Sequence, residues 1–306
     1  MPALATTPQE RLLAIFAQLT PELQRAARWV SGHPAEVGLW SMRRQAQALS
    51  VSPATMLRLA RAAGYASYDS FRAPFQQALA SGGYGLRQRA AKLQASGGQK
   101  GMLPAHDVLA GLQVRAVQSA CSLNAPAQFD AAVQVMLKAR LVGFLGSRSS
   151  FGTAYQMRYA YQLVQRNGVL LDGSGGTLDE QAEMLVEGDV LIAIGQAPYS
   201  SPTVRVAREA ARRGVALVAL TDDALSPLAL KAAHVLLFQS ESSAGAGSRK
   251  GPGSFFHTMA GPLALAEHLI ARFAARGGKA VLNRLDEVEL RLRDELAYWT
   301  PRGDTQ

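Results

Sequence analysis

The sequence predicts an all-α N-terminal domain with a helix-turn-helix, followed by an α/β domain whose strands form a doubly wound parallel sheet. Its 306 residues are enough for two domains with hydrophobic cores. Up to residue 140 the apolar side chains recur at helical spacing. Beyond it, short apolar runs alternate with mostly helical patterns, which is typical of strands buried on both faces. These runs lie at 141–145, 169–171, 190–194, 215–220 and 235–238.

The charge of the chain is divided unevenly between these two parts. The net charge is +9, and residues 1–140 hold 15 Lys and Arg against 6 Asp and Glu. The remaining residues hold 17 of each kind, so the whole excess lies in the helical part. This asymmetry predicts an N-terminal domain that binds a polyanion, joined to a neutral domain with another task. A basic solvated face without a partner is the alternative.

Capping residues mark the starts of the N-terminal helices. A first helix is predicted from Gln9 to Leu19, and Thr20-Pro21 starts a second that runs to about Ser31. Ser41 caps a third, short helix, and Ser52-Pro53 starts a fourth that ends at Gly64. The inward face of this fourth helix is predicted to consist of Met56, Leu59, Ala60 and Ala63. Its outward face is predicted to consist of Ala54, Thr55, Arg58 and Arg61.

Two short helices joined by a tight turn at 50–52 are typical of a helix-turn-helix, whose second helix enters the major groove of DNA. Arginines on that helix can reach guanine edges or phosphates, and its N-terminus can hold a phosphate. Exposed arginines on short helices are common, so the prediction of DNA binding depends largely on the excess of positive charge in residues 1–140. The predicted DNA-binding residues are Arg43, Arg44, Ser52, Thr55, Arg58 and Arg61.

Glycine-rich segments separate the two parts of the chain. Ser81-Gly82-Gly83 and Ser96-Gly97-Gly98 bracket a basic helical piece with Arg87, Arg89 and Lys92, which is typical of a hinge. We expect a helix-turn-helix domain at 1–80, a linker at 81–105, an α/β domain at 106–282 and a C-terminal helix and tail at 283–306. Two helices, from Asp107 to Leu123 and from Ala127 to Lys138, lead into the first strand.

The first strand breaks at Gly146 into the hydroxyl-rich loop of Ser147, Arg148, Ser149 and Ser150. A helix follows, with Ala154, Met157, Tyr161 and Val164 on one face and a predicted left-handed end at Asn167-Gly168. The free N–H groups at such a helix start favour an anion, with serine hydroxyls completing its shell. Ser201-Pro202 repeats the signal beyond the third strand, beside Ser200 and Thr203. Because ligands of parallel sheets bind beyond the carboxyl ends of the strands, the two helix starts together predict a phosphate site. The alternative is that the serines merely cap the helices.

Several other classes of site are not indicated. Cys121 is the only cysteine and is predicted to be a small core residue, and no cluster has the spacing of a metal site. No cofactor is expected, since residues 146–152 lack the Gly-x-Gly-x-x-Gly of a nicotinamide-binding loop. No apolar run approaches the roughly 20 residues that span a bilayer, so we expect a cytoplasmic protein without membrane contact.

Residues 41–65 resemble the N-terminal domain of RpiR-type bacterial transcriptional regulators, best at Ser52-Pro-Ala-Thr55, Arg58 and Gly64-Tyr65. In those regulators a sugar isomerase domain that senses phosphorylated sugars follows, and the resemblance spans nearly the whole chain. It implies an operator DNA and a phosphorylated sugar as effector. We also expect that a sugar acid can take this place, that the domain does not catalyse a reaction, and that the chain forms a homodimer or homotetramer.

The second domain matches the sugar isomerase pattern in its loops. Gly146, Ser149 and Ser150 follow the first strand, and Thr221-Asp222 follows the fourth. Two departures stand out: Arg148 replaces a glycine that is frequent in the family, and Gly195 replaces a frequent serine. Arg148 can pair with an acidic ligand or can narrow the pocket. The predicted ligand-binding residues are Ser147, Arg148, Ser149, Ser150, Ser200, Ser201, Thr203 and Thr221.

An active aldose–ketose isomerase is the rival function, because relatives of this domain catalyse that reaction with carboxylate and histidine groups. The candidates for these groups are Glu241, His257, Glu267 and His268. Glu267 and His268 fall in a long helical pattern at 254–276, where a polar pair usually faces solvent. A last helix is predicted from Asn283 to Trp299, and its apolar face fits either a subunit contact or packing on its own domain.

Overall fold

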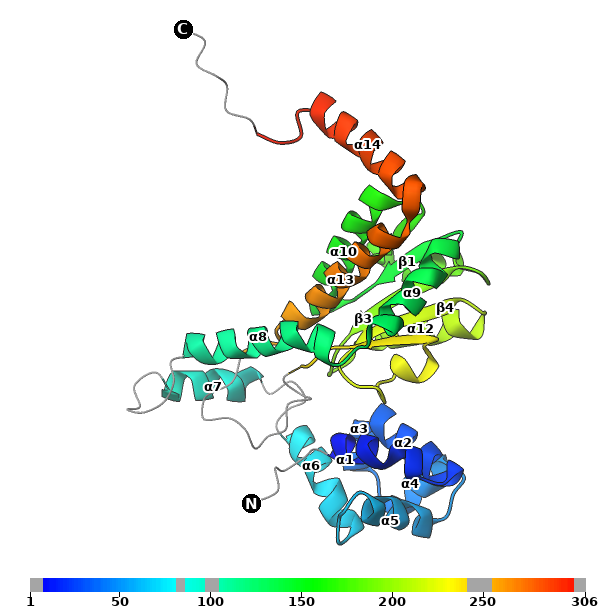
Figure 1. Cartoon of the computed structure of the whole chain (residues 1–306). Coiled ribbons are helices and arrows are strands. Elements are labelled where there is room, and N and C mark those ends of the chain that lie inside the picture. The colour runs from blue at the N-terminus through cyan, green and yellow to red at the C-terminus, as the bar shows by residue number, and fades with distance from the viewer. Residues whose placement is uncertain (1–7, 81–85, 97–104, 241–254, 300–306) are drawn as a thin grey trace.

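The computed structural model describes residues 8–80, 86–96, 105–240 and 255–299. The first described range contains helices joined by short turns and has no strand (Figure 1). Among the sequence predictions, Glu241 and most of the glycine-rich linker lie outside the described residues. The helices of this range are α1 Pro8–Ile15 with a 3-10 turn at Phe16–Gln18, α2 Pro21–Gly32, α3 Pro34–Leu39, α4 Met42–Ala48, α5 Pro53–Ala62 and α6 Tyr68–Ala80.

The predicted caps set the helix starts in this domain. The Ser41 hydroxyl accepts a hydrogen bond from the Arg44 amide (3.3 Å), and the Ser52 hydroxyl accepts one from the Thr55 amide (3.2 Å). Gln45 is fully buried, and its side-chain amide donates to the carbonyls of Val37 (3.1 Å) and Trp40 (2.9 Å). This bonding ties α3 to α4 and compensates for the burial of a polar group.

Helix α7 (Leu86–Ser96) is the basic piece of the linker, and α8 (Ala105–Ser122) and α9 (Pro126–Lys138) lead into the sheet. The sheet has five parallel strands in the order β2-β1-β3-β4-β5. All six residues of β3 are buried, which explains its continuous apolar run. The strands are β1 Val142–Leu145, β2 Gly168–Leu171, β3 Val190–Gly195, β4 Ala216–Thr221 and β5 His234–Leu237.

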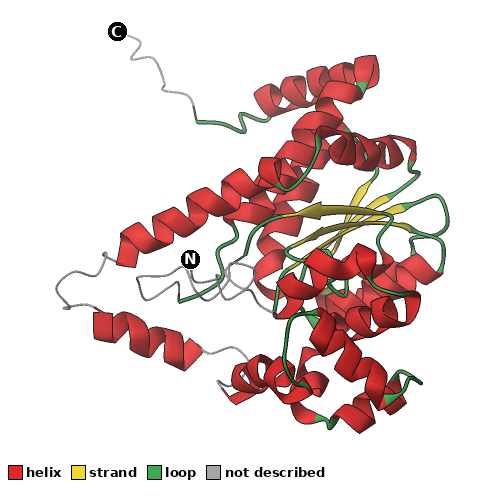
Figure 2. Cartoon of the chain, turned by 60° about the horizontal axis from the view of Figure 1, so that its bottom comes forward, coloured by secondary structure: helices red, strands yellow, loops and turns green. Residues whose placement is uncertain are grey.

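Helices cover both faces of this sheet (Figure 2). One core contains residues of α9, of α10 (Phe151–Val164) and of α13 (Ala260–Arg276), such as Tyr161 and Phe273. The other contains residues near α11 (Leu178–Glu183) and on α12 (Ser201–Arg212), such as Leu185 and Val206. The fold is therefore the predicted doubly wound α/β domain after a helical domain. Within the described residues, no helix is both long and apolar enough to cross a membrane.

Some local predictions were wrong. Helix α10 ends at Val164, and Gly168 starts β2 without a left-handed φ. A Cβ on Gly168 would lie 2.7 Å from the Tyr161 ring, so close packing accounts for this glycine. Cys121 is exposed, with its Sγ 3.8 Å from Nδ1 of His268.

Two helix boundaries also differ from the predictions. The last helix, α14, spans Gly278–Asp294, so it starts and ends earlier than expected. Helix α13 starts at Ala260, and residues 255–259 before it are not helical. Helix α3 was not predicted.

Candidate functional site

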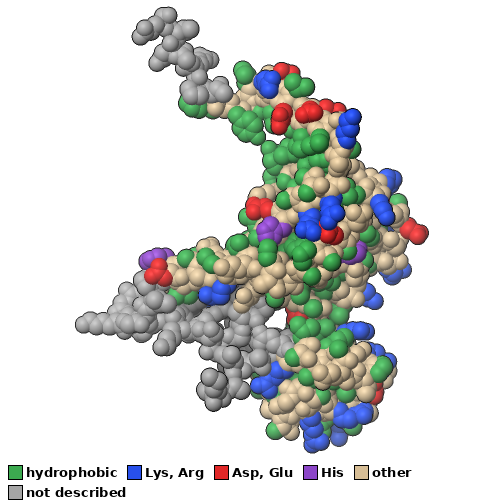
Figure 3. Space-filling model, in the orientation of Figure 1, with side chains coloured by type: hydrophobic (Ala, Val, Ile, Leu, Met, Phe, Trp, Pro, Cys, Tyr) green, Lys and Arg blue, Asp and Glu red, His purple; other side chains and the backbone are tan. Residues whose placement is uncertain are grey.

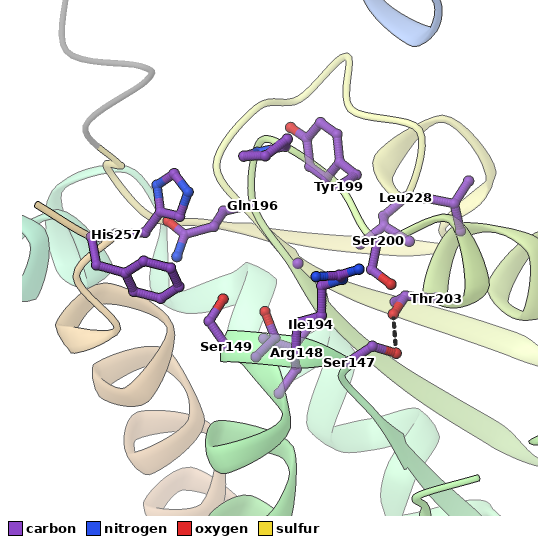
Figure 4. A pocket seen from close by; sticks show the side chains of 15 residues that line it. Ser147, Arg148, Ser149, Ile194, Gln196, Tyr199, Ser200, Thr203, Leu228 and His257 are labelled. Carbon is purple, nitrogen blue, oxygen red and sulfur yellow. Dashed lines mark hydrogen bonds between the residues drawn. The ribbon is translucent and has the colours of Figure 1, made fainter. Parts of the chain in front are cut away.

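A cavity of about 190 Å³ lies beyond the carboxyl ends of β1 and β3 (Figure 4). The loop after β1 leads into α10 and the loop after β3 leads into α12, so both helix N-termini face the cavity, as expected at the switch point of a doubly wound sheet. The lining residues are Ser147, Arg148, Ser149, Ser150, Ile194, Gly195, Gln196, Pro198, Tyr199, Ser200, Thr203, Val204, Leu228, Phe256 and His257.

One hydrogen bond joins the two hydroxyl-rich loops. The Thr203 hydroxyl on α12 donates to the Ser147 hydroxyl after β1 at 2.9 Å (Figure 4). Thr203 is 2% exposed and Ser150 is 5% exposed, so this side of the cavity is a fixed polar wall. The serines are not caps: Ser147, Ser150 and Ser200 stand at helix starts, yet none accepts a capping hydrogen bond on its side chain.

Ser200 and Gln196 carry polar atoms whose hydrogen-bonding capacity is unused. The Ser200 hydroxyl and the Gln196 Oε1 are both buried and without a hydrogen-bond partner. The amide nitrogen of Gln196 is committed, since it donates to the Thr258 carbonyl at 3.3 Å. Buried polar groups are rarely left unpaired, and those that are often mark a binding site. Both atoms belong to side chains that line the cavity, which makes these two residues candidates for contact with a polar ligand.

Arg148 is held in an unusual backbone conformation. Its φ is +56°, in the left-handed region where residues other than Gly, Asn and Asp are uncommon. The backbone at Arg148 therefore has a conformation that favours glycine, and the residue places a guanidinium at the cavity. No carboxylate is among the described lining residues, so Arg148 gives the site a positive charge that no neighbouring acid in the lining offsets.

A buried network supports the loop that carries Ser200. The Tyr199 hydroxyl donates to Asp222 Oδ1 at 2.7 Å, and Asp222 Oδ2 accepts from the Ser240 hydroxyl at 2.7 Å and from the Ala197 amide at 3.2 Å. Burial raises the pKa of the Asp222 carboxyl, while these hydrogen bonds counter part of the increase. The same burial raises the pKa of Tyr199. These contacts hold the loop after β3, which carries Ser200, in position beside the cavity.

The structure brings together six of the eight predicted ligand-binding residues and excludes two. Ser201 is exposed and does not line the cavity, because Ser200 takes the N-cap position and α12 starts at Ser201 itself. Thr221 is fully buried, and its hydroxyl donates to Ser226 at 3.0 Å, so it braces the next loop. The sequence predictions did not include Gln196 or Tyr199, since neither carries a local motif.

The candidate acid–base residues are not gathered at this site. His257 lines the cavity, whereas Glu267 and His268 are exposed on α13 and are not among its lining residues. In the part of the chain that the structure describes, no group of three His, Cys, Asp or Glu residues could hold a metal ion.

The predicted DNA-binding surface is only partly as expected. Arg43, Arg44, Arg58 and Arg61 are exposed, and Lys and Arg side chains gather on the N-terminal domain (Figure 3). The Arg44 guanidinium stacks over the Trp40 ring, 4.4 Å from its centroid.

Thr55 was predicted on the outward face of α5, and this was wrong. It is fully buried because Glu22 of α2 closes over it: the Thr55 hydroxyl donates to Glu22 Oε1 at 3.0 Å. The same hydroxyl accepts from Arg58 Nη2 at 3.0 Å. The Thr55 hydroxyl thus holds the Arg58 side chain in place. Ser52 is exposed but its hydroxyl is engaged in capping, with Thr55 Oγ1 2.9 Å away.

Comparisons with known proteins agree with this architecture. Residues 136–254 match the SIS domain family. An uncharacterized HTH-type transcriptional regulator of Haemophilus influenzae is 26% identical over 232 residues, covering 73% of this chain and 77% of that protein. The HTH-type transcriptional regulator HexR of Pseudomonas aeruginosa is 24% identical over 222 residues, covering 72% of this chain and 74% of HexR.

Two solved structures extend the comparison. The sugar isomerase domain of an RpiR transcription factor from Sphaerobacter thermophilus is 26% identical, with a TM-score of 0.52, and the match covers 60% of this chain and 97% of that domain. The NanR protein of Vibrio vulnificus, solved in complex with ManNAc-6P, matches over 95% of this chain and 100% of its own, with a TM-score of 0.55. At 19% identity NanR shows the shared fold alone.

The helical N-terminal domain, the SIS domain and these relatives define a transcriptional regulator of the helix-turn-helix class. Within that class, a SIS domain that follows a helical domain and the similarity to the sugar isomerase domain of an RpiR transcription factor support an RpiR-type regulator.

Proposed function

We propose that the chain binds operator DNA through α4 and α5, and that an acidic metabolite bound between the starts of α10 and α12 modulates this binding. The effector is a phosphorylated sugar or a related sugar acid. The observation that carries this proposal is the buried, unpartnered Ser200 hydroxyl beside Thr203 and Ser150, where two helix N-termini face one cavity. Helix starts and hydroxyls of this kind are donors suited to a phosphate.

The charge of the cavity favours an anion further. The described lining contains Arg148 and His257 but no carboxylate. Arg148 can pair in a bidentate manner with a carboxylate or phosphate, which a glycine at that position cannot do. A ligand with two acidic groups, one at the helix starts and one at Arg148, therefore fits the site better than a neutral sugar. NanR, which shares the fold, was solved with a phosphorylated sugar, and this agrees with the ligand class proposed here.

We also propose that the site senses its ligand without converting it. Aldose–ketose isomerisation requires a group that moves a proton between neighbouring carbons. Of the described lining residues, His257 is the only histidine, and no carboxylate is present in the lining beside it. The curated relatives are named as regulators, which favours sensing over catalysis.

For DNA recognition we propose a symmetric assembly, a homodimer or a homotetramer. Two recognition helices related by a two-fold axis would read an inverted repeat, with half-sites about one helical turn or a multiple apart. Arg58, oriented by Thr55 and Glu22, would contact a base, while Arg43 and Arg44 would contact phosphates. Arg61 lies on the same exposed face one turn further along α5.

A thermal-shift screen of phosphorylated sugars and sugar acids tests the proposal. A ligand present at a hundred times its dissociation constant should add about 2.7 kcal/mol to the stability of the domain that binds it. We expect a shift with at least one acidic sugar and none with the corresponding neutral sugars. A shift with neutral sugars alone, or turnover of a bound sugar phosphate that disappears on His257→Ala, would contradict the proposal.

A further inference from the structure

A leucine of the SIS domain is buried in the core of the N-terminal domain. Leu225 belongs to the loop after β4, yet it is 4% exposed and packs in the same hydrophobic cluster as Leu12, Val30 and Phe71. Leu230, further along the loop, packs against the same cluster. Figures 1 and 4 show this loop between the sheet and the N-terminal helices. The segment 222–230, called the docking loop below, therefore joins the two domains.

The other side of the docking loop faces the ligand cavity. Leu228 is 1% exposed and lines the cavity, only three residues from Leu225. At the start of the loop, Asp222 holds the Tyr199 hydroxyl, and Tyr199 also lines the cavity. One short segment thus contacts the proposed ligand site and the core of the N-terminal domain.

Hydrogen bonds within the docking loop and to the end of β4 hold its conformation. The Asp223 carboxylate accepts from the Leu225 amide at 2.8 Å, and the Ser226 hydroxyl accepts from the Ala229 amide at 3.0 Å. The Thr221 hydroxyl donates to Ser226 from the end of β4. A loop bonded internally at each turn moves as a unit, so a shift of Leu228 or Tyr199 also displaces Leu225.

We infer that the docking loop couples the ligand cavity to the N-terminal domain, with Leu225 as its apolar anchor. This inference rests on the proposed function of the cavity, since it needs a ligand that binds there. A ligand that displaces Tyr199 or Leu228 shifts Leu225 in the N-terminal core, and this changes the position or the packing of helix α5, which carries Arg58. The coupling is reciprocal, so DNA on the N-terminal domain alters ligand affinity by the same factor.

The tryptophans of the chain provide a direct readout. There are three in the sequence: Trp29 and Trp40 lie in the N-terminal domain, and Trp299 is 85% exposed near the end of the chain. Trp29 is one of the side chains packed against the cluster that contains Leu225. In a Trp299→Phe background, a ligand in the cavity can change tryptophan emission only through the N-terminal domain.

The experiment uses the full-length Trp299→Phe chain with inorganic phosphate and glucose 6-phosphate as probes. Calorimetry measures binding, and tryptophan emission measures the response of the N-terminal domain. We expect a saturable emission change with the same midpoint as the calorimetric titration. Leu225→Ala should reduce this change at least fivefold while the calorimetric dissociation constant stays within threefold. Leu225→Met, which keeps an apolar side chain of similar volume, should preserve the change.

Two further variants separate coupling from general loosening. Leu230→Ala, on the same docking loop, should also reduce the emission change, whereas Met184→Ala, at a half-exposed apolar position elsewhere on the SIS domain, should not. Thermal unfolding of each variant checks that it is folded. Probe binding without an emission change in the Trp299→Phe chain would overturn the coupling and leave the ligand site intact, as would an unreduced change in Leu225→Ala. Absence of binding by both probes in calorimetry would instead contradict the proposed ligand site, and the inference with it.

Discussion

Replacing Ser200 with alanine separates a ligand-binding hydroxyl from a structural one. In the ligand-free chain the Ser200 hydroxyl is buried and has no hydrogen-bond partner. The alanine variant therefore loses no bond within the protein, and it no longer buries an unsatisfied polar group, whose desolvation costs about 1–3 kcal/mol. The free energy of unfolding without ligand should stay the same or rise.

The effect on ligand binding should have the opposite sign. A hydrogen bond from a hydroxyl to a phosphate contributes about 1–3 kcal/mol, so Ser200→Ala should weaken effector binding roughly 5- to 150-fold. Ser150→Ala at the start of α10 should weaken binding by a similar factor. Isothermal titration calorimetry with the effector found by thermal shift measures both changes.

Ser201→Ala is the matched control, because Ser201 is the next residue but is exposed and outside the cavity. Its affinity for the effector should remain within about twofold of the wild type, the change expected of a surface substitution. Wild-type affinity in both Ser200→Ala and Ser150→Ala would refute the assignment of the site. A marked loss of stability in Ser200→Ala would show that its hydroxyl is structural.

The remaining predictions concern DNA binding and stability. Arg58→Ala should lower specific DNA affinity by about 1–3 kcal/mol and relax the base preference at one position per half-site. Selection from a randomised DNA pool measures this preference, and an unchanged selected sequence would contradict base reading by Arg58. Arg43→Ala or Arg44→Ala should weaken all sequences alike and lower the slope of log affinity against log salt by about 1, in titrations at several salt concentrations. Asp189→Ala should destabilise the SIS domain by about 2–4 kcal/mol in urea unfolding. The reason is that the fully buried carboxylate accepts hydrogen bonds from the Leu141 amide at 3.0 Å and from the Val186 amide at 2.9 Å. A change below about 1 kcal/mol would show that these amides find other partners.

The architecture was predictable because its signals are local. Strands β3 and β4 are buried on both faces, so their sequences are continuous apolar runs that periodicity detects. The starts of α2, α4 and α5 carry a capping residue or a proline, and the structure begins each helix where these predict. The hydroxyl-rich loops were recognisable for the same reason, since each follows a strand and precedes a helix.

The errors arise where tertiary contacts override local patterns. Helical spacing places Thr55 on the outer face of α5, but the side chain of Glu22, 33 residues earlier, covers it. Gly168 follows an asparagine, a pair typical of left-handed helix ends, yet it is needed for the approach of the Tyr161 ring. The network of Tyr199 and Asp222 joins two loops 23 residues apart, and no local motif announces it. Nothing in the local sequence distinguishes Leu225 from other loop leucines, because its burial depends on packing against the N-terminal domain.

The central claim is that one chain binds DNA through its helical domain and an acidic sugar through its SIS domain. The most direct measurement is a titration of the full-length chain against genomic DNA fragments at two salt concentrations, with and without the effector identified by thermal shift. We predict tight binding to a few fragments that share an inverted repeat, an affinity that falls as salt rises, a change in that affinity on adding the effector, and loss of the preference in Arg58→Ala. Equal binding to all fragments with no response to any acidic sugar would contradict the claim.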